Sequence, residues 1–259
     1  MGSEELTKVI VIANQKGGVG KTTTAVNIAA CMAVTEIPTL IIDMDPQSNA
    51  TSGLGIELAN GDKSVYDVMI NSVDAKSVIR NSDLPHLDIL PSSTRLVGAE
   101  IELVPALARE TILKGALGSL NGDYEYIFID CPPTLGLQTL NSLTAADTVL
   151  VPVQCEYFAL EGLSQLLNTI RLVQKNLNKT LEVEGFLITM FDSRLNLSRQ
   201  VADEIRDYFK EKVFETVINR NVKLGEAQSF GKPIILYDAV STGAGNYMNL
   251  VREMLENAG

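Results

Sequence analysis

Two lysines, three glycines and two threonines stand together in residues 16–23 and could bind a polyphosphate. The stretch is Lys16-Gly17-Gly18-Val19-Gly20-Lys21-Thr22-Thr23. Glycines let successive backbone N–H groups turn toward one point, and a helix that begins there adds partial positive charge from its N-terminus. Lys21 would then reach the β- and γ-phosphates of a nucleotide, and the Thr22 hydroxyl would ligate Mg²⁺.

The flanking residues predict a strand before this stretch and a helix after it. Residues 9–13 form an apolar run, and apolar residues recur at helical spacing over residues 25–32. Phosphate-binding loops occur in this strand-to-helix context. The alternative, a glycine-rich turn between two solvated lysines, is disfavoured by the same context.

The stretch departs in one place from the usual phosphate-loop pattern G-x-x-x-x-G-K-[ST]. Gln15 stands where the first glycine is expected, and an extra lysine, Lys16, follows it. A dinucleotide-binding G-x-G-x-x-G is disfavoured, because its third glycine would fall in the run from Lys21 to Thr23.

Three carboxylates follow apolar runs and could serve the same nucleotide. Asp43 and Asp45 follow residues 38–42, and Asp130 ends the run that begins at residue 124. The carboxyl ends of parallel strands form the ligand-binding edge of an open α/β sheet. Asp45 could hold the attacking water, Asp43 could support Mg²⁺ or the loop lysine, and Asp130 could bind a Mg²⁺ water. Taken alone, Asp43 and Asp45 are explained equally well as turn residues without a function.

Apolar runs alternate with helical patterns along most of the chain. Four to six strands in this arrangement predict an α/β fold of the P-loop nucleotidase type, with a mostly parallel, doubly wound sheet and helices on both faces. A segment rich in Ser, Asn, Thr and Gly at residues 47–63 predicts a mobile loop, and the pattern over 94–120 predicts a helix bent or interrupted at Pro105. Further strands are predicted at residues 87–91, 148–153 and 184–190, and further helices at 64–70 and 160–177.

The length allows one large α/β domain or two small ones, and because no low-complexity linker divides the chain we expect a single domain over residues 1–259, with residues 1–7 as an N-terminal tail that is partly foreign to the natural chain. We expect a cytosolic protein, because the chain has neither a membrane-length apolar run nor a signal sequence. The three cysteines, Cys31, Cys131 and Cys155, form no C-x-x-C pair and are predicted to be buried thiols. With His86 as the only histidine, a Ser-His-Asp triad or a histidine metal site has no support.

The net charge of −11 argues against a nucleic-acid partner, but the charges are unevenly distributed. Residues 1–188 contain 12 Lys+Arg and 22 Asp+Glu, whereas residues 189–233 contain 8 and 7. Any contact with DNA is therefore expected in the later segment.

Taken in order, these motifs resemble the ParA/MinD family of deviant Walker-type ATPases, and within it the ParA (Soj) branch that partitions chromosomes and plasmids. The resemblance rests on residues 16–23, on Asp43-x-Asp45-Pro46-Gln47, on Asp130-Cys131-Pro132-Pro133 and on Val151-Pro152-Val153, and it runs from about Lys8 to about Leu255.

The resemblance implies roles for individual residues. Lys16 would reach across a homodimer interface to the partner's phosphates, and Gly17 and Gly18 would let the two loops approach. Lys21 would bind the β/γ-phosphates, and Thr23 would contact the α-phosphate. Among the metal and water ligands, Thr22 would bind Mg²⁺, Asp130 would complete the metal shell and Asp45 would orient the water.

The resemblance also implies non-specific binding of duplex DNA by the ATP-bound dimer. The candidate DNA contacts are Arg194, Arg199, Arg220 and Lys223. Lys223 stands where the family usually has arginine, which loses the bidentate phosphate geometry, and Asn219 stands where proline is usual. The alternative is that these residues are solvated surface bases among nearby acids.

The implied partner is a ParB-like centromere-binding activator, and the implied location is the cytoplasm, on the nucleoid in the ATP state. A membrane role of the MinD type is not expected, because the C-terminal residues 250–259 are net acidic and predict a helix that covers the core. A nucleotide-gated switch that positions a protein cargo without binding DNA stays open as the alternative.

Overall fold

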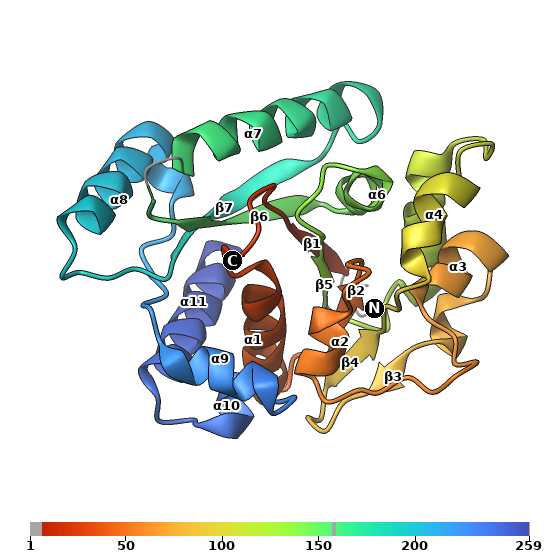
Figure 1. The fold of residues 1–259 in the computed structure, drawn as a ribbon, viewed down its shortest axis with the longest axis horizontal. Helices are drawn as coiled ribbons and strands as arrows, with labels where there is room; N and C mark the ends of the chain where they lie inside the picture. Colours follow the sequence, from red (N-terminus) through yellow and green to blue (C-terminus); the bar gives the residue numbers. More distant parts are fainter. Residues whose placement is uncertain (1–6, 157–158, 259) are drawn as a thin grey trace, which may run out of the picture.

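The computed structural model describes residues 7–156 and 159–258 and is built on one seven-stranded sheet (Figure 1). The order across the sheet is β3-β4-β2-β5-β1-β6-β7, and every neighbouring pair is parallel except β3 and β4. The strands are β1 (Lys8–Ile12), β2 (Thr39–Asp43), β3 (Arg80–Asn81), β4 (Leu87–Leu90), β5 (Tyr126–Asp130), β6 (Thr148–Gln154) and β7 (Glu182–Thr189).

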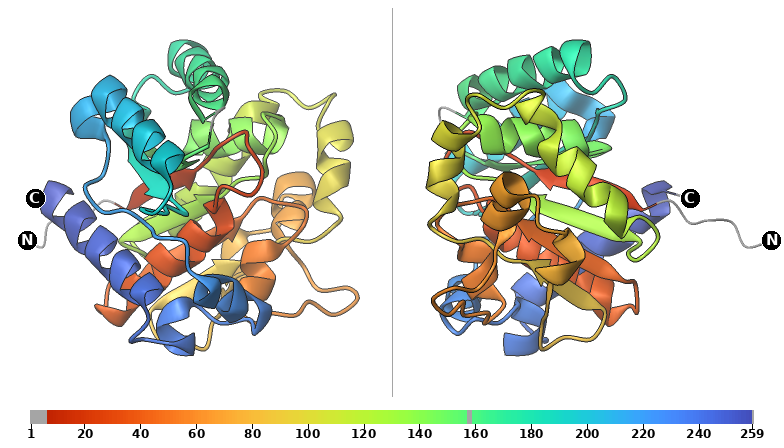
Figure 2. Two further views of the ribbon diagram at one scale, coloured as in Figure 1. Left: turned by 60° about the vertical axis from the view of Figure 1, so that its left-hand side comes forward. Right: turned by 90° about the vertical axis from the view of Figure 1, so that its right-hand side faces the viewer.

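Helices cover both faces of the sheet, so the predicted doubly wound α/β fold is confirmed (Figures 1 and 2). One face carries α1 (Lys21–Val34), α2 (Asn49–Gly53), α9 (Val222–Ser229), α10 (Ile234–Tyr237) and α11 (Thr242–Ala258). The other face carries α3 (Val65–Asn71), α4 (Leu96–Glu102), α5 (Ile112–Leu117), α6 (Leu137–Ala145), α7 (Ala159–Asn176) and α8 (Asn196–Phe209). Single 3-10 turns lie at Ala75–Ser77, Arg109–Thr111, Gly118–Leu120 and Lys210–Lys212.

The two layers of helices explain why the strands are apolar along their whole length. In β1, Val9 and Val11 point into one core and Ile10 and Ile12 into the other, because successive side chains of a strand alternate between faces. Each large side chain buried in this way stabilises the fold by about 1.5–3 kcal/mol.

Two predictions about local structure were wrong. The sheet has seven strands rather than four to six, because the two-residue β3 pairs antiparallel at the edge and is too short to show a pattern. Residues 47–63 are not loop throughout, since they contain α2. This short helix depends on a tertiary contact of Thr51, described below, that the local sequence does not reveal.

The other helical predictions are confirmed. The segment 94–120 is interrupted around Pro105, because α4 ends at Glu102 and α5 begins at Ile112. α3 begins with a capping box in which the Ser64 backbone N–H donates to Asp67 Oδ2 at 3.0 Å.

The C-terminal helix α11 packs against α1, as predicted for a helix that covers the core. Tyr247 of α11 is 1% exposed, and its hydroxyl lies 3.2 Å from Thr24 Oγ1 of α1. All three cysteines are buried thiols, as predicted. Within residues 7–156 and 159–258, no helix combines the length and the apolar character that a membrane crossing needs.

Candidate nucleotide and DNA sites

Three neighbouring central strands bring the predicted phosphate loop and the carboxylates to one edge of the sheet. In the β1–β5 ladder Ile12 pairs with Asp130, and in the β2–β5 ladder Asp43 pairs with the same residue. The loop after Ile12 therefore begins beside Asp130, and Asp43 lies on the other side of Asp130, one strand further along the sheet. Lys21, Asp43, Asp45 and Asp130 are all buried there.

The glycine-rich loop is held in a conformation that favours glycine. Gly18 and Gly20 have φ values of 75° and 87°, and Gly20 is the N-cap residue of α1. The Thr189 hydroxyl at the end of β7 donates to the Val19 carbonyl at 2.8 Å and fixes the loop to the sheet. The free N–H groups at the start of α1 thus face the carboxyl edge, where an anion would bind.

Lys21 lies inside the curve of this loop. Its ammonium donates to the Lys16 carbonyl at 3.1 Å, and the residue is 7% exposed. Burial lowers the pKa of Lys21, and the negative charges of Asp130 and Asp45 oppose that change. The geometry therefore holds a cation ready at the position where the loop would receive phosphate oxygens.

Asp130 pairs with Thr22 in a way that suits a divalent metal. Thr22 Oγ1 donates to Asp130 Oδ2 at 2.7 Å, whereas the buried Oδ1 has no hydrogen-bond partner among the described residues. Burial, followed by the negative charge of Asp43, raises the pKa of Asp130 well above its usual range, while the Thr22 bond lowers it. A hydroxyl, an unpaired carboxylate oxygen and excess negative charge are the donor chemistry that Mg²⁺ prefers.

Asp43 is the most heavily bonded of the three carboxylates. Its Oδ2 accepts from Thr51 N at 2.9 Å and from Thr51 Oγ1 at 2.7 Å, and its Oδ1 accepts from Asp45 N at 3.1 Å. Burial raises the pKa of Asp43 to about 6, although the bonds from Thr51 and Asp45 lower it. Asp43 therefore fixes both the Asp45 turn and α2, a role that its spacing in the sequence does not show.

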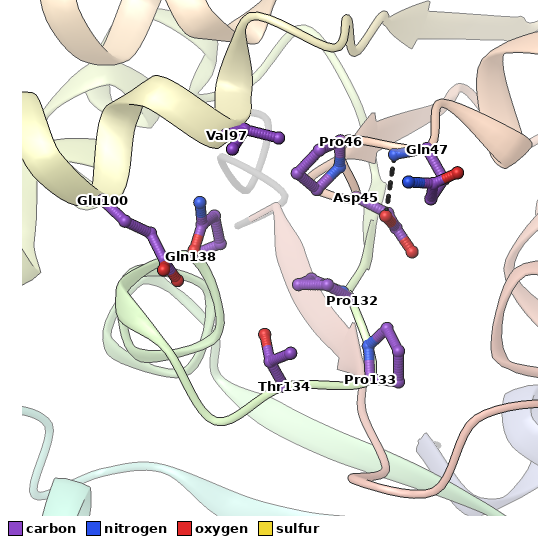
Figure 3. Close-up of a pocket in the computed structure, with 9 residues that line it drawn as sticks. All are labelled: Asp45, Pro46, Gln47, Val97, Glu100, Pro132, Pro133, Thr134 and Gln138. Carbon is purple, nitrogen blue, oxygen red and sulfur yellow. Dashed lines mark hydrogen bonds between the residues drawn. The ribbon is translucent and has the colours of Figure 1, made fainter.

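Asp45 lies in the turn after β2 and lines an open cavity of about 310 Å³ (Figure 3). Its Oδ1 accepts from Gln47 N at 2.9 Å. The remaining lining comes from the Pro46-Gln47 turn, the loop after β5, α4 and α6, and consists of Val97, Glu100, Pro132, Pro133, Thr134 and Gln138.

Lys16 points away from this buried cluster. It is 35% exposed and forms an ion pair with Glu156. Its backbone N–H donates to Asn14 Oδ1 at 3.0 Å, and Asn14 in turn bonds to the Pro152 carbonyl at 2.7 Å. Thus the two lysines of the loop have different environments, one inside the loop and one at the surface.

A second cavity, of about 410 Å³, was not predicted from the sequence. Gly20 and Thr23 of the phosphate loop form one wall. The opposite wall comes from the end of β7 and from the segment before and within α9, including Met190, Asn219, Arg220 and Leu224. No motif marks these residues, because tertiary packing alone brings residue 20 next to residue 220.

The four predicted DNA contacts are exposed at the surface, and two of their segments lie side by side. Phe191 pairs with Asn219 in an isolated β-bridge. The bridge places Arg194 and Arg220 on adjacent segments of the chain. Arg194 is 85% exposed and binds Asp192 through two bonds of 2.8 and 2.6 Å. These bonds lower the pKa of Asp192 to about 2, with a smaller contribution from Arg220.

The other two basic residues are held by their own helices. Arg199, in the first turn of α8, bonds to Asn196 Oδ1. Lys223, in the first turn of α9, forms an ion pair of 3.2 Å with Glu226. The structure thus brings Arg194 and Arg220 onto neighbouring segments and places Arg199 and Lys223 on separate helices.

A glycine contact joins the carboxylate side of the site to α9. Gly55, just after α2, and Gly231, just after α9, have φ values of 73° and 63°. A Cβ added at Gly231 would lie 2.8 Å from Gly55 Cα and 3.1 Å from the Ser52 carbonyl oxygen. The two backbones touch so closely that neither position has room for a side chain.

Comparison with known proteins agrees with this geometry. A protein-family profile described as an AAA domain matches residues 7–183. The sporulation initiation inhibitor protein Soj of Bacillus subtilis is 56% identical over 250 residues, which are 96% of this chain and 99% of that protein. The chain belongs to the ParA/MinD family of deviant Walker-type ATPases, on its ParA (Soj) branch.

A second relative and a solved structure extend the comparison. The chromosome partitioning protein ParA of Myxococcus xanthus is 53% identical over 249 residues, which are 96% of this chain and 88% of that protein. A crystal structure described as cobyrinic acid a,c-diamide synthase from Mycobacterium smegmatis with bound ADP and magnesium is 36% identical. It has a TM-score of 0.86 and covers 97% of this chain and 95% of its own. The resemblance to the ParA branch predicted from the motifs is thereby confirmed.

Proposed function

We propose that this chain is a Mg²⁺-dependent ATPase that partitions DNA and acts as a single domain over residues 1–259. The observation that carries the proposal is the Thr22–Asp130 pair, in which Asp130 Oδ1 has no partner among the described residues, together with the loop that holds the Lys21 ammonium. ParA-branch membership and a 36% identical structure described with ADP and magnesium support it.

In this proposal the phosphate loop binds the nucleotide through its backbone and two side chains. The N–H groups of Gly17, Gly18, Val19 and Gly20 surround the phosphates, the Lys21 ammonium neutralises the β/γ-phosphates, and Thr23 contacts the α-phosphate. Thr22 and Asp130 hold Mg²⁺, and the metal supplies neutralisation of the charge that develops on the phosphate oxygens. The cavity between Gly20 and Arg220 is large enough to receive the nucleoside.

Hydrolysis would depend on the turn after β2. We assign Asp45 to orient the attacking water and Asp43 to hold that turn through the Asp45 N–H while adding negative charge to the metal site. Because phosphoryl transfer relies mainly on positioning and electrostatics, we expect a slow basal rate that a partner increases.

The exposed Lys16 supports a sandwich homodimer formed on ATP binding. The lysine would exchange its Glu156 ion pair for the phosphates of the partner subunit. An ion pair between half-exposed groups contributes only about 0–1 kcal/mol, so that exchange has a low cost. Gly17 and Gly18 leave the surface of the loop free of large side chains.

The dimer would then bind duplex DNA without sequence specificity through Arg194, Arg199, Arg220 and Lys223. Arg220 lines the same cavity as Gly20 and Thr23, so nucleotide binding there would directly affect a DNA-binding segment. We propose that a ParB-like centromere-binding protein stimulates hydrolysis and releases DNA, and that the protein is cytoplasmic and on the nucleoid in its ATP state.

The test is binding to non-specific duplex DNA with ADP and with ATP at two salt concentrations. Asp45→Ala should retain ATP, dimerise and bind DNA, and Arg194→Ala in that background should weaken DNA binding while leaving dimerisation intact. ATP-dependent dimerisation without any DNA binding would overturn the partition function and favour a nucleotide-gated switch with a protein cargo.

A further inference from the structure

The helix α1 carries one buried polar side chain that the proposed nucleotide site does not use. Residues 25–33 of this helix are apolar except for Asn27, which is 4% exposed. Asparagine is a poorer helix former than alanine, and a buried amide costs free energy unless its polar atoms find partners. The presence of Asn27 must therefore be explained by the contacts of its side chain.

The Asn27 side chain bridges the phosphate loop and the C-terminal part of the chain. Its Nδ2 donates to the Thr23 carbonyl at 2.7 Å, and its Oδ1 accepts from the Ile234 N–H at 2.7 Å. Thr23 belongs to the phosphate loop, whereas Ile234 is 0% exposed and begins α10. An amide supplies both the donor and the acceptor that these two backbone groups require, so we call this arrangement the Asn27 bridge.

The helix α10 connects the Asn27 bridge to a proposed DNA contact. α10 lies beside α1 and α9 (Figure 1). Its last residue, Tyr237, donates to Glu226 Oε2 at 3.2 Å, and the Lys223 ammonium pairs with the same oxygen at 3.2 Å. The Lys223 ammonium also lies 5.7 Å from the centroid of the Tyr237 ring. Lys223 is thus held by α10 as well as by its own helix.

The phosphate loop and the C-terminal segment also pack against each other beside the bridge. One small hollow there is lined from the loop side by Thr22, Thr23 and Asn27, and from the other side by Leu224, Gln228 and Lys232. Closely packed side chains have little free volume in which a displacement could be lost. A change in the first turn of α1 therefore reaches α10 over a few direct contacts.

We propose that Asn27 is a positioning residue that couples nucleotide at the phosphate loop to DNA binding by Lys223. The inference rests on the proposed function, because it takes nucleotide at Thr22 and Thr23 and DNA at Lys223 as given. Nucleotide contacts order the first turn of α1, and the Asn27 bridge passes that order to Ile234 and so to α10. Since coupling between two binding sites is reciprocal, DNA at Lys223 strengthens nucleotide binding by the same factor.

A second buried bond from the same part of α1 provides a matched control. Thr24 is 0% exposed, and its Oγ1 lies 3.2 Å from Tyr247 Oη of α11. This bond also joins α1 to the C-terminal part of the chain, but it bypasses α10. Thr24→Val keeps the shape of the side chain and removes the bond, whereas Asn27→Ala removes the Asn27 bridge and keeps a good helix former. Both variants should lose stability in urea unfolding, because each leaves a buried polar group without its partner.

The first measurement is hydrogen exchange of the full chain with and without Mg-ATP, followed on peptides that cover α10. All variants are made in the Asp45→Ala background, so that the nucleotide is not consumed. ATP should slow the exchange of the α10 amides by about threefold or more in this background and in Thr24→Val. In Asn27→Ala the exchange of the same amides should be nearly independent of ATP.

The second measurement is the affinity of the same ATP-bound variants for non-specific duplex DNA. Asn27→Ala should weaken DNA binding by about threefold to tenfold, whereas Thr24→Val should change it by less than about twofold. Asn27→Ala should add nothing to the effect of Lys223→Ala, because the two changes act through one contact. It should add in full to the effect of Arg194→Ala, because Arg194 lies on another segment. Light scattering confirms that each variant forms the dimer.

Tyr237→Phe tests the far end of the connection without touching the buried bridge. It keeps the ring that stacks on Phe230 at 5.5 Å between centroids and removes the bond to Glu226. DNA binding should weaken by about twofold, as expected for one exposed hydrogen bond, and this effect should also vanish in Lys223→Ala. The variant keeps the inference testable if Asn27→Ala does not fold.

Three results would overturn the inference. ATP could slow the exchange of α10 equally in Asn27→Ala, the effects of Asn27→Ala and Lys223→Ala on DNA binding could add in full, or Thr24→Val could weaken DNA binding as much as Asn27→Ala does. Absence of DNA binding by the ATP state in the Asp45→Ala background would instead overturn the partition function. The exchange measurement needs no DNA, so it would still decide whether the phosphate loop acts on α10.

Discussion

The carboxyl edge of the sheet and the segment from Asp192 to Lys223 both carry the charges proposed for function, but they hold them in opposite ways. At the edge, Lys21, Asp43 and Asp130 are buried, and burial dominates the pKa shift of each. In the later segment, Arg194 and Lys223 are exposed and paired with neighbours a few residues away. The edge is thus preorganised at a cost in folding stability. The exposed ion pairs of the basic segment cost little stability, and their side chains can exchange one partner for another.

The largest effect should come from removing the charge at the centre of the edge. Asp130→Asn should lower ATP hydrolysis by about 100-fold or more, because the metal-facing oxygen is lost. The same change should raise the stability of the nucleotide-free protein at pH 7 by about 1–3 kcal/mol, because a buried, incompletely bonded carboxylate is neutralised. Steady-state hydrolysis and urea unfolding measure the two effects. Loss of activity together with loss of stability would mean that Asp130 is structural.

The pH dependence of the free energy of unfolding should show directly how much the buried Asp43 carboxylate destabilises the folded chain. The pKa of Asp43 is about 6 in the folded chain against an ordinary value of 3.8, so the folded state holds this proton more tightly than the unfolded state. Stability from this group is therefore present below about pH 4 and is lost as pH rises to about 6, by about 3 kcal/mol in total. Urea unfolding of the nucleotide-free protein and of Asp43→Asn at pH 4 and pH 7 measures it.

In that experiment the unmodified chain and Asp43→Asn serve as controls for each other. The stability of Asp43→Asn relative to the unmodified chain should increase between the two pH values, because only the unmodified chain has to ionise a carboxyl group at this buried position. A constant difference would mean that Asp43 titrates normally in the folded protein.

In the segment from Asp192 to Lys223, substitutions should have smaller effects, and these should change DNA binding but not ATP hydrolysis. Arg194→Ala should reduce the affinity of the ATP state for duplex DNA severalfold and lower the magnitude of its salt dependence by about one per subunit. Its basal hydrolysis should equal that of the unmodified chain, because Arg194 touches no residue of the edge. DNA titrations at several salt concentrations measure the slope, and an equal fall in hydrolysis would contradict the separation of the two regions.

The smallest expected change is a gain in affinity for DNA. Asp192→Asn releases Arg194 from two hydrogen bonds and should tighten DNA binding by about twofold to fivefold, as expected for an exposed ion pair. Because the pKa of Asp192 is about 2, lowering the pH from 8 to 5 should not mimic this substitution. Weaker DNA binding by Asp192→Asn would show that Asp192 positions Arg194 for the phosphate backbone.

The sequence predicted the residues at the carboxyl edge of the sheet better than the contacts that join this edge to the rest of the fold. Apolar runs and the loop from Lys16 to Thr23 depend on local pattern, and the topology of a parallel sheet then places Asp43 and Asp130 together. The bond from Thr51 to Asp43 joins residues eight positions apart across a turn, so α2 was predicted as loop. The cavity between Gly20 and Arg220 depends on packing between distant segments, which no local pattern specifies.

The contact between Gly55 and Gly231 has a consequence for how the molecule opens. Two backbones without intervening side chains have no flexible layer to absorb a displacement, so α2 and α9 should unfold locally as one cooperative unit. Their amide hydrogens should then exchange with solvent at a common rate, although the helices are far apart in the chain. Nucleotide at the carboxyl edge would slow that exchange in both helices together.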